Sequence, residues 1–127
     1  MQNNDNKFDL DLQFGQGIES RLQKILASKG LVEIKTERDV WKRTKNFVNE
    51  IECRGKPSGL MTTRADWWIH AFYDSSQDEI EFAFLFQVNK LKKYIHSKEH
   101  LVSYGGDDNQ SKLIIIPIQD VHEILTL

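Results

Sequence analysis

The sequence has almost no cysteine and no long apolar run, and each absence excludes a class of protein. Cys53 is the only cysteine in 127 residues, so an internal disulfide and a four-thiolate zinc site are impossible. The longest apolar run, LIIIPI at 113–118, falls far short of the ~20 residues of a membrane-spanning helix. The first residues, MQNNDNKFDLD, are polar and acidic, unlike a signal peptide. We therefore expect a soluble protein of the reducing cytoplasm.

The chain also lacks a strong net charge. Its 17 Lys and Arg oppose 19 Asp and Glu, which gives a formal net charge of −2 at pH 7. No global field attracts nucleic acid at this charge, so any basic binding surface must be local. The length is sufficient for one domain with a real core. We expect a single domain over 1–127, with residues 1–7 disordered.

Hydrophobic periodicity predicts an α+β fold with a single mixed β-sheet flanked by helices. Helical spacing predicts helices over 17–30 and 88–100 and a helical turn over 119–125. Alternation and aromatic content predict strands over 31–37, 46–53, 67–73, 79–87 and 113–118. The segments 67–73 and 79–87 read as a hairpin. The order helix, four strands, helix, strand is typical of this fold class.

The first two predicted strands each carry acidic side chains on one face. One face of the pair holds Val32, Ile34, Phe47 and Ile51, and the other holds Glu33, Lys35, Glu37, Glu50 and Glu52. We expect an antiparallel hairpin whose apolar face joins the core, with Glu37 opposite Glu50 and Lys35 opposite Glu52. Glu19 joins the acidic face if the first helix packs across the sheet.

Two interpretations of this acidic face are open. One is the solvated face of an antiparallel sheet, because repulsion between carboxylates at ~4 Å in water is only about 1 kcal/mol. The other is a divalent-cation site. Mg²⁺ prefers oxygen ligands, usually one or two carboxylates with water and substrate phosphate. A cation bound there polarises phosphate and activates water.

Several motifs resemble those of one known group of proteins. The helical acid Glu19, the strands VEIKTE and NFVNEIEC and the run GKPSGLMTTRADWWIHAF are similar to motifs of the PD-(D/E)XK nuclease superfamily. Within it, they resemble small phage-type endonucleases and Holliday-junction-resolvase-like proteins. The resemblance covers roughly residues 15–118, and its most specific part is GKPSG…TTRADWW. It implies a restriction-endonuclease-like fold and an enzyme that acts in the cytoplasm, in a bacterial host if phage-encoded.

The resemblance also implies a metal-dependent deoxyribonuclease and assigns its metal ligands. Glu37 stands in place of the first strand acid, and Glu50 begins the second motif. Glu37, Glu50 and the backbone carbonyl of Ile51 are the implied ligands of Mg²⁺, for which Mn²⁺ can substitute. Glu19 matches the helical acid of the resolvase-like members, and with Glu52 it is expected to bind a second ion or to orient water.

The chain departs from the family pattern in its second motif. Glu52 stands where lysine is usual, so Lys35 is expected to supply the ammonium that stabilises the phosphate transition state. Glu33-Ile34-Lys35 also spells the signature. No acid lies between Glu19 and Glu33 to act as the upstream aspartate. The alignment on Glu37 and Glu50-Ile51-Glu52 is therefore the better one.

Basic residues close to the acidic strands are the expected DNA contacts. They are Lys42, Arg43, Lys45, Arg54, Lys56 and Arg64. Phosphate contacts of this kind give salt-dependent binding without sequence readout, so cleavage selective for DNA structure, such as a branch or junction, is expected. No membrane partner is expected, and a homodimer and an RNA substrate stay open. The alternative function is a nucleic-acid-binding or regulatory module that keeps the fold without catalysis.

The histidines and Cys53 show no spacing typical of zinc ligands. His96 and His100 lie four residues apart without the middle of the HExxH motif. We interpret these residues as ordinary surface or core side chains.

Overall fold

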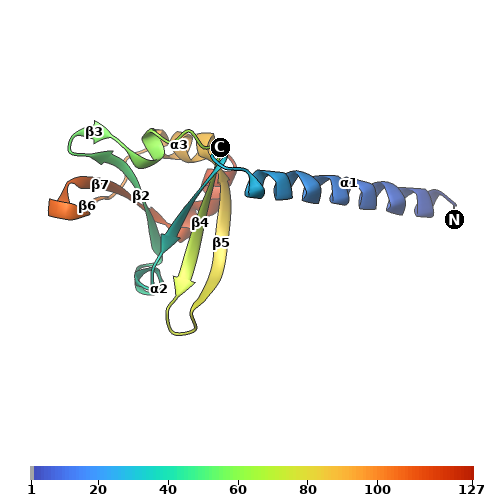
Figure 1. The fold of residues 1–127 in the computed structure, drawn as a ribbon, viewed down its shortest axis with the longest axis horizontal. Helices are drawn as coiled ribbons and strands as arrows, with labels where there is room; N and C mark the ends of the chain where they lie inside the picture. The colour runs from blue at the N-terminus through green and yellow to red at the C-terminus, as the bar shows by residue number, and fades with distance from the viewer. Residues whose placement is uncertain (1) are drawn as a thin grey trace.

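A computed structural model describes residues 2–127. Helix α1 (Gln2–Ala27) begins well before the expected start at residue 17 and projects away from the rest of the molecule (Figure 1). The expected disordered segment, residues 1–7, lies at the free end of this helix, except for Met1, which is outside the described residues. Among residues 2–127, no helix has both the length and the apolar character needed to cross a membrane.

Three strands form the first sheet, in the order β1-β4-β5. Strand β1 (Val32–Glu37) runs parallel to β4 (Trp67–Asp74), and β4 pairs antiparallel with β5 (Glu79–Gln87). The expected hairpin of residues 67–87 is therefore confirmed. A register shift between Phe72 and Tyr73 interrupts it near its tip.

Four strands form a second, antiparallel sheet, in the order β3-β2-β7-β6. They are β2 (Asn46–Cys53), β3 (Lys56–Pro57), β6 (Val102–Gly105) and β7 (Ser111–Pro117). The α+β class is confirmed, but the strands divide between two sheets instead of the single mixed sheet that the element order indicated.

The expected hairpin of β1 and β2 is wrong. Helix α2 (Val40–Thr44) separates the two strands, and its Trp41 packs edge-on against Phe72 and Phe82 at 5.6 and 5.3 Å between ring centroids. The Trp41 indole also donates a hydrogen bond to the Tyr73 carbonyl at 2.9 Å. These contacts direct the chain away from β1, so that β2 pairs with β7 along its length. Glu37 and Glu50 are therefore not cross-strand neighbours.

The remaining elements are one longer helix and four short helical segments. Helix α3 (Val88–Ser97) ends three residues before the expected end at residue 100, and α4 (Val121–Leu125) confirms the expected terminal turn. Three 3₁₀ turns complete the chain: η1 (Gly59–Met61), η2 (Asp107–Asn109) and η3 (Ile118–Asp120).

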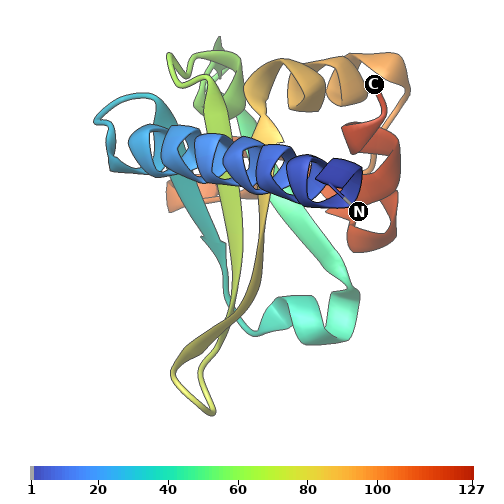
Figure 2. The same cartoon turned by 90° about the vertical axis from the view of Figure 1, so that its right-hand side faces the viewer.

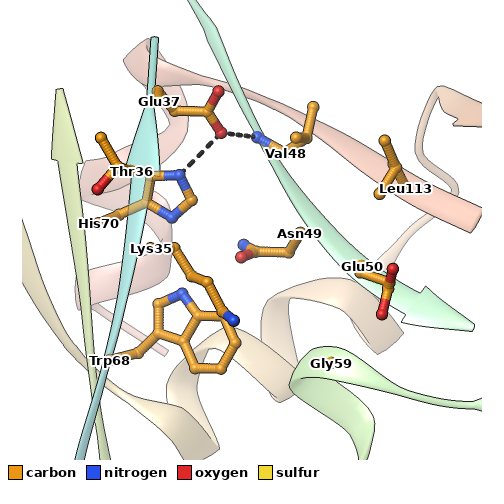
Figure 3. A pocket seen from close by; sticks show the side chains of 10 residues that line it. All are labelled: Lys35, Thr36, Glu37, Val48, Asn49, Glu50, Gly59, Trp68, His70 and Leu113. Atoms are coloured by element: carbon orange, nitrogen blue, oxygen red, sulfur yellow. Dashed lines mark hydrogen bonds and ion pairs between the residues drawn. The ribbon is translucent and has the colours of Figure 1, made fainter. Parts of the chain in front are cut away.

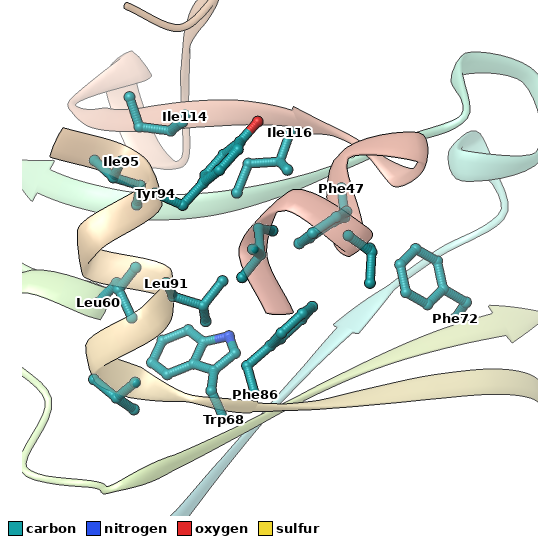
Figure 4. Close-up of a cluster of buried hydrophobic side chains, with 13 residues drawn as sticks. Phe47, Leu60, Trp68, Phe72, Phe86, Leu91, Tyr94, Ile95, Ile114 and Ile116 are labelled. Carbon is teal, nitrogen blue, oxygen red and sulfur yellow. The ribbon is translucent and has the colours of Figure 1, made fainter. Parts of the chain in front are cut away.

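The core lies between the two sheets and includes side chains of α3 and α4 (Figure 4). Its largest fully buried apolar side chains come from both sheets, from η1 and from the two helices: Phe47, Leu60, Trp68, Phe72, Phe86, Leu91, Tyr94, Ile116 and Ile124. The rings of Phe47 and Phe86 stack at 6.1 Å, which joins β2 of one sheet to β5 of the other. Side chains therefore fill the space between the sheets, and their packing fixes the positions of the strands that carry the candidate site.

The two faces of β1 are the reverse of the expectation. The parallel register places Glu33, Lys35 and Glu37 beside Trp68, His70 and Phe72, which point inward. Val32 and Ile34 therefore face outward, and Ile34 is 63% exposed. Alternation along β1 is as predicted, but β4, not β2, decides which face joins the core.

Candidate functional site

A pocket of about 280 Å³ opens where β1, β2 and β4 approach one another (Figure 3). Its lining comes from both sheets and from η1: Lys35, Thr36, Glu37, Val48, Asn49, Glu50, Gly59, Trp68, His70 and Leu113. Three predicted site residues, Lys35, Glu37 and Glu50, therefore lie around one space although their strands do not pair.

The Glu37 carboxylate bridges the two sheets at this pocket through hydrogen bonds. Its Oε1 accepts a hydrogen bond from the Val48 amide of β2 at 2.8 Å. The same oxygen lies 2.8 Å from Nε2 of His70 on β4. Because an ionised carboxylate only accepts hydrogen bonds, we assign the imidazole proton to Nε2. Two donors on one oxygen hold the carboxylate in a fixed orientation.

The floor of the pocket is polar and buried. Asn49 is 2% exposed and His70 is 1% exposed. Within residues 2–127, no hydrogen-bond partner is found for either amide atom of Asn49, for Nδ1 of His70 or for the indole nitrogen of Trp68. A buried polar atom left without a partner costs about 1–3 kcal/mol. The floor is therefore suited to water or to a polar ligand.

Gly59 holds the backbone of Glu50 at the pocket's edge. Its φ is +55°, and a Cβ built on it would lie 2.3 Å from the Glu50 carbonyl oxygen. An L side chain fits neither the backbone conformation nor the space. The glycine of the GKPSG motif thus permits η1 to pack directly on β2 beneath Glu50.

Lys35 lies at the mouth of the pocket beside a second acid. Its ammonium is 3.4 Å from Glu33 Oε2 and 5.5 Å from the centroid of the Trp68 ring. The side chain is 46% exposed, so the ion pair with Glu33 is weak and the ammonium is free to contact an anion at the mouth.

Three other predicted site residues do not line the pocket. Glu19 is exposed on the projecting helix α1 (Figure 1). Ile51 packs against the core, and its carbonyl already accepts the Ser58 amide at 3.0 Å. Glu52 lies further along β2, paired with Pro57 and Lys112. Of the predicted metal ligands, only Glu37 and Glu50 therefore line this pocket.

The predicted DNA-contacting residues occupy three short segments. Lys42, Arg43 and Lys45 belong to α2 and its end, Arg54 and Lys56 to the β2–β3 turn, and Arg64 to the loop before β4. All are exposed except Lys42, which is half-buried. Arg54 and Gly55 have φ values of 53° and 79°, as the two central residues of a tight hairpin turn require.

Lys42 is engaged within the protein. Its ammonium lies 2.6 Å from the buried carboxylate of Asp74. Hydrogen bonding to Lys42, then to Ser76, holds the pKa of Asp74 well below its usual range. The same hydrogen bond raises the pKa of Lys42. Lys42 is therefore better described as an anchor of α2 than as a free phosphate contact.

The pocket is lined by side-chain oxygens of a kind that can ligate a divalent cation. Among residues 2–127, no group of three or more His, Cys, Asp and Glu side chains is close enough to hold a metal ion. Two carboxylates, Glu37 and Glu50, and the buried amide oxygen of Asn49 nevertheless line the same space. These are oxygen ligands of the kind that Mg²⁺ prefers, with water completing its coordination.

Three residues that shape this pocket, His70, Asn49 and Gly59, are not among the predicted site residues. His70 interrupts the apolar strand WWIHAF, and Asn49 occupies a core-facing position of β2. A polar residue on an apolar strand face is the sequence feature that could have identified both. Gly59 was visible only as part of a turn motif. Its role depends on the contact with Glu50, which no local pattern reveals.

Searches of family models, of curated proteins and of solved structures found no match to this chain.

Proposed function

We propose that this protein is a metal-dependent endonuclease that hydrolyses DNA phosphodiester bonds at the pocket of Lys35, Glu37 and Glu50. The observation that carries the proposal is their convergence. One ammonium and two carboxylates from strands of different sheets line a single open pocket. The proposal also rests on the resemblance to PD-(D/E)XK nucleases.

Glu37 and Glu50, with the Asn49 amide oxygen, would hold Mg²⁺ or Mn²⁺. The bound cation supplies a polarised phosphate and a water of lowered pKa. Glu37 is held ready by the Val48 amide and His70, which reduces the cost of ordering it on binding. Lys35, at the mouth, is placed to stabilise negative charge on the phosphate.

DNA would be held by exposed basic residues that adjoin, in the sequence, the strands lining the pocket. Arg54 and Lys56 follow β2, which carries Glu50, and Arg64 precedes β4, which carries His70. Such contacts read the backbone and not the bases, so the proposed substrate is DNA of a particular shape, such as a branched junction.

A second candidate is a nucleic-acid-binding module without catalysis. It is favoured by one observation, the lack of three clustered metal-ligating side chains among residues 2–127. This candidate predicts that DNA binds with the same salt dependence but is never cut.

The test is cleavage of a labelled four-way junction and of a matched linear duplex, with Mg²⁺ and with EDTA. We expect Mg²⁺-dependent cutting of the junction, abolished by Glu50→Gln and retained by Glu79→Gln, a matched change at an exposed glutamate of β5. Binding without cutting of any DNA or RNA by the wild type would support the second candidate and refute the first.

A further inference from the structure

The outer face of the β1-β4-β5 sheet is apolar and carries no charge. The strand register places these side chains on it: Val32, Ile34, Thr36, Trp67, Ile69, Ala71, Tyr73, Ile80, Ala83, Leu85 and Gln87. None of them carries a formal charge at neutral pH. Ile34 is 63% exposed and Ile80 is 66% exposed. The exposed face of a sheet is normally polar, so this composition is typical of a face that is covered.

Helix α1 has a matching apolar stripe. Phe14, Ile18, Leu22, Ile25 and Leu26 recur at the three- and four-residue spacing of one helix face. Phe14 is 73% exposed and Leu26 is 53% exposed. An isolated helix gains little stability in water, because most helical stability in proteins comes from packing such a stripe. The apolar stripe of α1 is therefore expected to pack against another apolar surface.

These two surfaces do not cover each other within one chain. The start of β1 is fixed, because the Leu31 carbonyl accepts the amides of Asp66 and Trp67 at 3.1 and 2.9 Å. From there α1 runs outward from the sheet, as the two ribbon views together show (Figures 1 and 2). Within residues 2–127, nothing packs over Ile34.

We propose that α1 of a second copy covers the outer face of the β1-β4-β5 sheet, and that the exchange is reciprocal. The occupant is another copy of this chain because the chain itself supplies both halves of the contact, an exposed apolar helix and an exposed apolar sheet face. An uncharged face offers no attraction to nucleic acid, which leaves the pocket side of the molecule for DNA.

The size of the contact is sufficient for a specific dimer. The helix stripe continues one turn before Phe14 to Leu10, which is 65% exposed, so residues 10–26 span about 26 Å at ~1.5 Å per residue. A strand of eight residues has the same length, and a helix is about 10 Å wide. One helix on one sheet therefore has a footprint of about 260 Å² on each surface. A reciprocal dimer contains four such surfaces, about 1,000 Å² in all, which reaches the lower limit for a specific interface. This inference does not depend on the nuclease proposal.

The first test is the mass of the full chain by sedimentation equilibrium. We expect twice the chain mass of 14.9 kDa for the wild type. Leu22→Glu on the helix and Ile34→Glu on the sheet should each raise the dissociation constant at least about 100-fold, because each dimer would bury two new carboxylates. Matched controls are Lys24→Glu, on another side of α1, and Lys56→Glu, on the second sheet. Both should stay dimeric. A monomeric wild type at about 100 μM would overturn the proposal.

A second test separates the helix-on-sheet contact from a dimer of two α1 helices. In a Cys53→Ser background, Leu22→Cys and Ile69→Cys chains are made separately, mixed and oxidised. We expect a disulfide between the two variants and none within either variant alone. Cross-linking of Leu22→Cys chains to each other, or a disulfide within one chain carrying both changes at high dilution, would overturn the proposal. Far-ultraviolet circular dichroism confirms that each variant is folded.

Discussion

The Glu37 carboxylate and the His70 imidazole lie 2.8 Å apart, and Glu37 also accepts the amide of Val48. Since β1 and β4 belong to one sheet and β2 to the other, a single side-chain oxygen connects the two sheets at the proposed site. Glu37 therefore has a structural role that is separable from the metal-binding role proposed for it.

Glu37→Ala and Glu37→Gln should separate these roles. Alanine removes the acceptor of two donors, and we expect it to lower the free energy of unfolding by about 2 kcal/mol or more. Glutamine keeps an oxygen for the Val48 amide and should cost less. Both should abolish cleavage, because both remove the charge. Urea unfolding and junction cleavage measure the two effects, and wild-type cleavage by the folded Glu37→Gln variant would remove Glu37 from the site.

Variants at Glu33 and Lys35 test which segment is the nuclease signature, Glu33-Ile34-Lys35 or Glu50-Ile51-Glu52. Glu33 lies four residues from Glu37 on β1, about 13 Å away at ~3.3 Å per residue, so both cannot ligate one ion. Glu33→Ala should reduce cleavage only modestly, by removing the carboxylate that helps to position the Lys35 ammonium. Lys35→Ala should lower kcat with little change in KM. If Glu33→Ala were inactive and Glu37→Gln fully active, Glu33-Ile34-Lys35 would be the true signature.

Gly59→Ala should be among the most damaging single-methyl changes in the chain. The added Cβ would meet the Glu50 carbonyl oxygen at 2.3 Å, and the φ of +55° disfavours alanine independently. We expect a fall in melting temperature together with loss of cleavage. Gly17→Ala is the matched control, since its Cβ meets nothing within 4 Å inside α1 and should stabilise the helix by about 0.5–1 kcal/mol. Equal melting temperatures for the two variants would contradict this account of η1.

Lys42→Met should destabilise the protein in a pH-dependent way. Because the folded-state pKa of Asp74 is depressed by Lys42, the contribution of Asp74 is present above its unfolded pKa of about 3.9 and is lost as pH falls through the lower folded value. The wild type should therefore exceed Lys42→Met in stability at pH 7, and the difference should shrink below about pH 4. The hydrogen bond between the carboxyl groups of Glu81 and Asp74 raises the pKa of Glu81.

The measurement is urea unfolding of both proteins from pH 7 down to pH 3. Arg43→Met, at the exposed next residue of α2, is the control and should track the wild type at every pH. A difference between wild type and Lys42→Met that stays constant across this range would show that the ion pair with Asp74 is not the cause.

Local patterns predicted the elements but not how the strands associate. The alternation of β1 and β2 was clear, and the β4–β5 hairpin followed from its short polar turn. Pairing of β2 with β7 joins residues 58 to 71 positions apart, for example Phe47 with Ile116, and no local signal specifies such a partner. The single predicted sheet failed for this reason, and so did the placement of Ile34 in the core.

The family resemblance predicts the charged residues of the candidate site, but the residues that position them are visible only in the folded structure. Lys35, Glu37 and Glu50 are conspicuous because charged residues are unusual in strands. Asn49, His70 and Gly59 act through contacts with other strands, so only the folded chain identifies them. Glu19 was placed by analogy with a helix that packs across the sheet, whereas α1 projects away from it (Figure 1).

Metal binding by Glu37 and Glu50 is tested most directly by anomalous diffraction from a crystal soaked in Mn²⁺. We expect one strong peak in the pocket, about 2.2 Å from carboxylate oxygens of both Glu37 and Glu50, and its loss in crystals of Glu50→Gln. A soaked crystal with no peak in the pocket, or with a peak held by Glu33 or Glu19 instead, would contradict it.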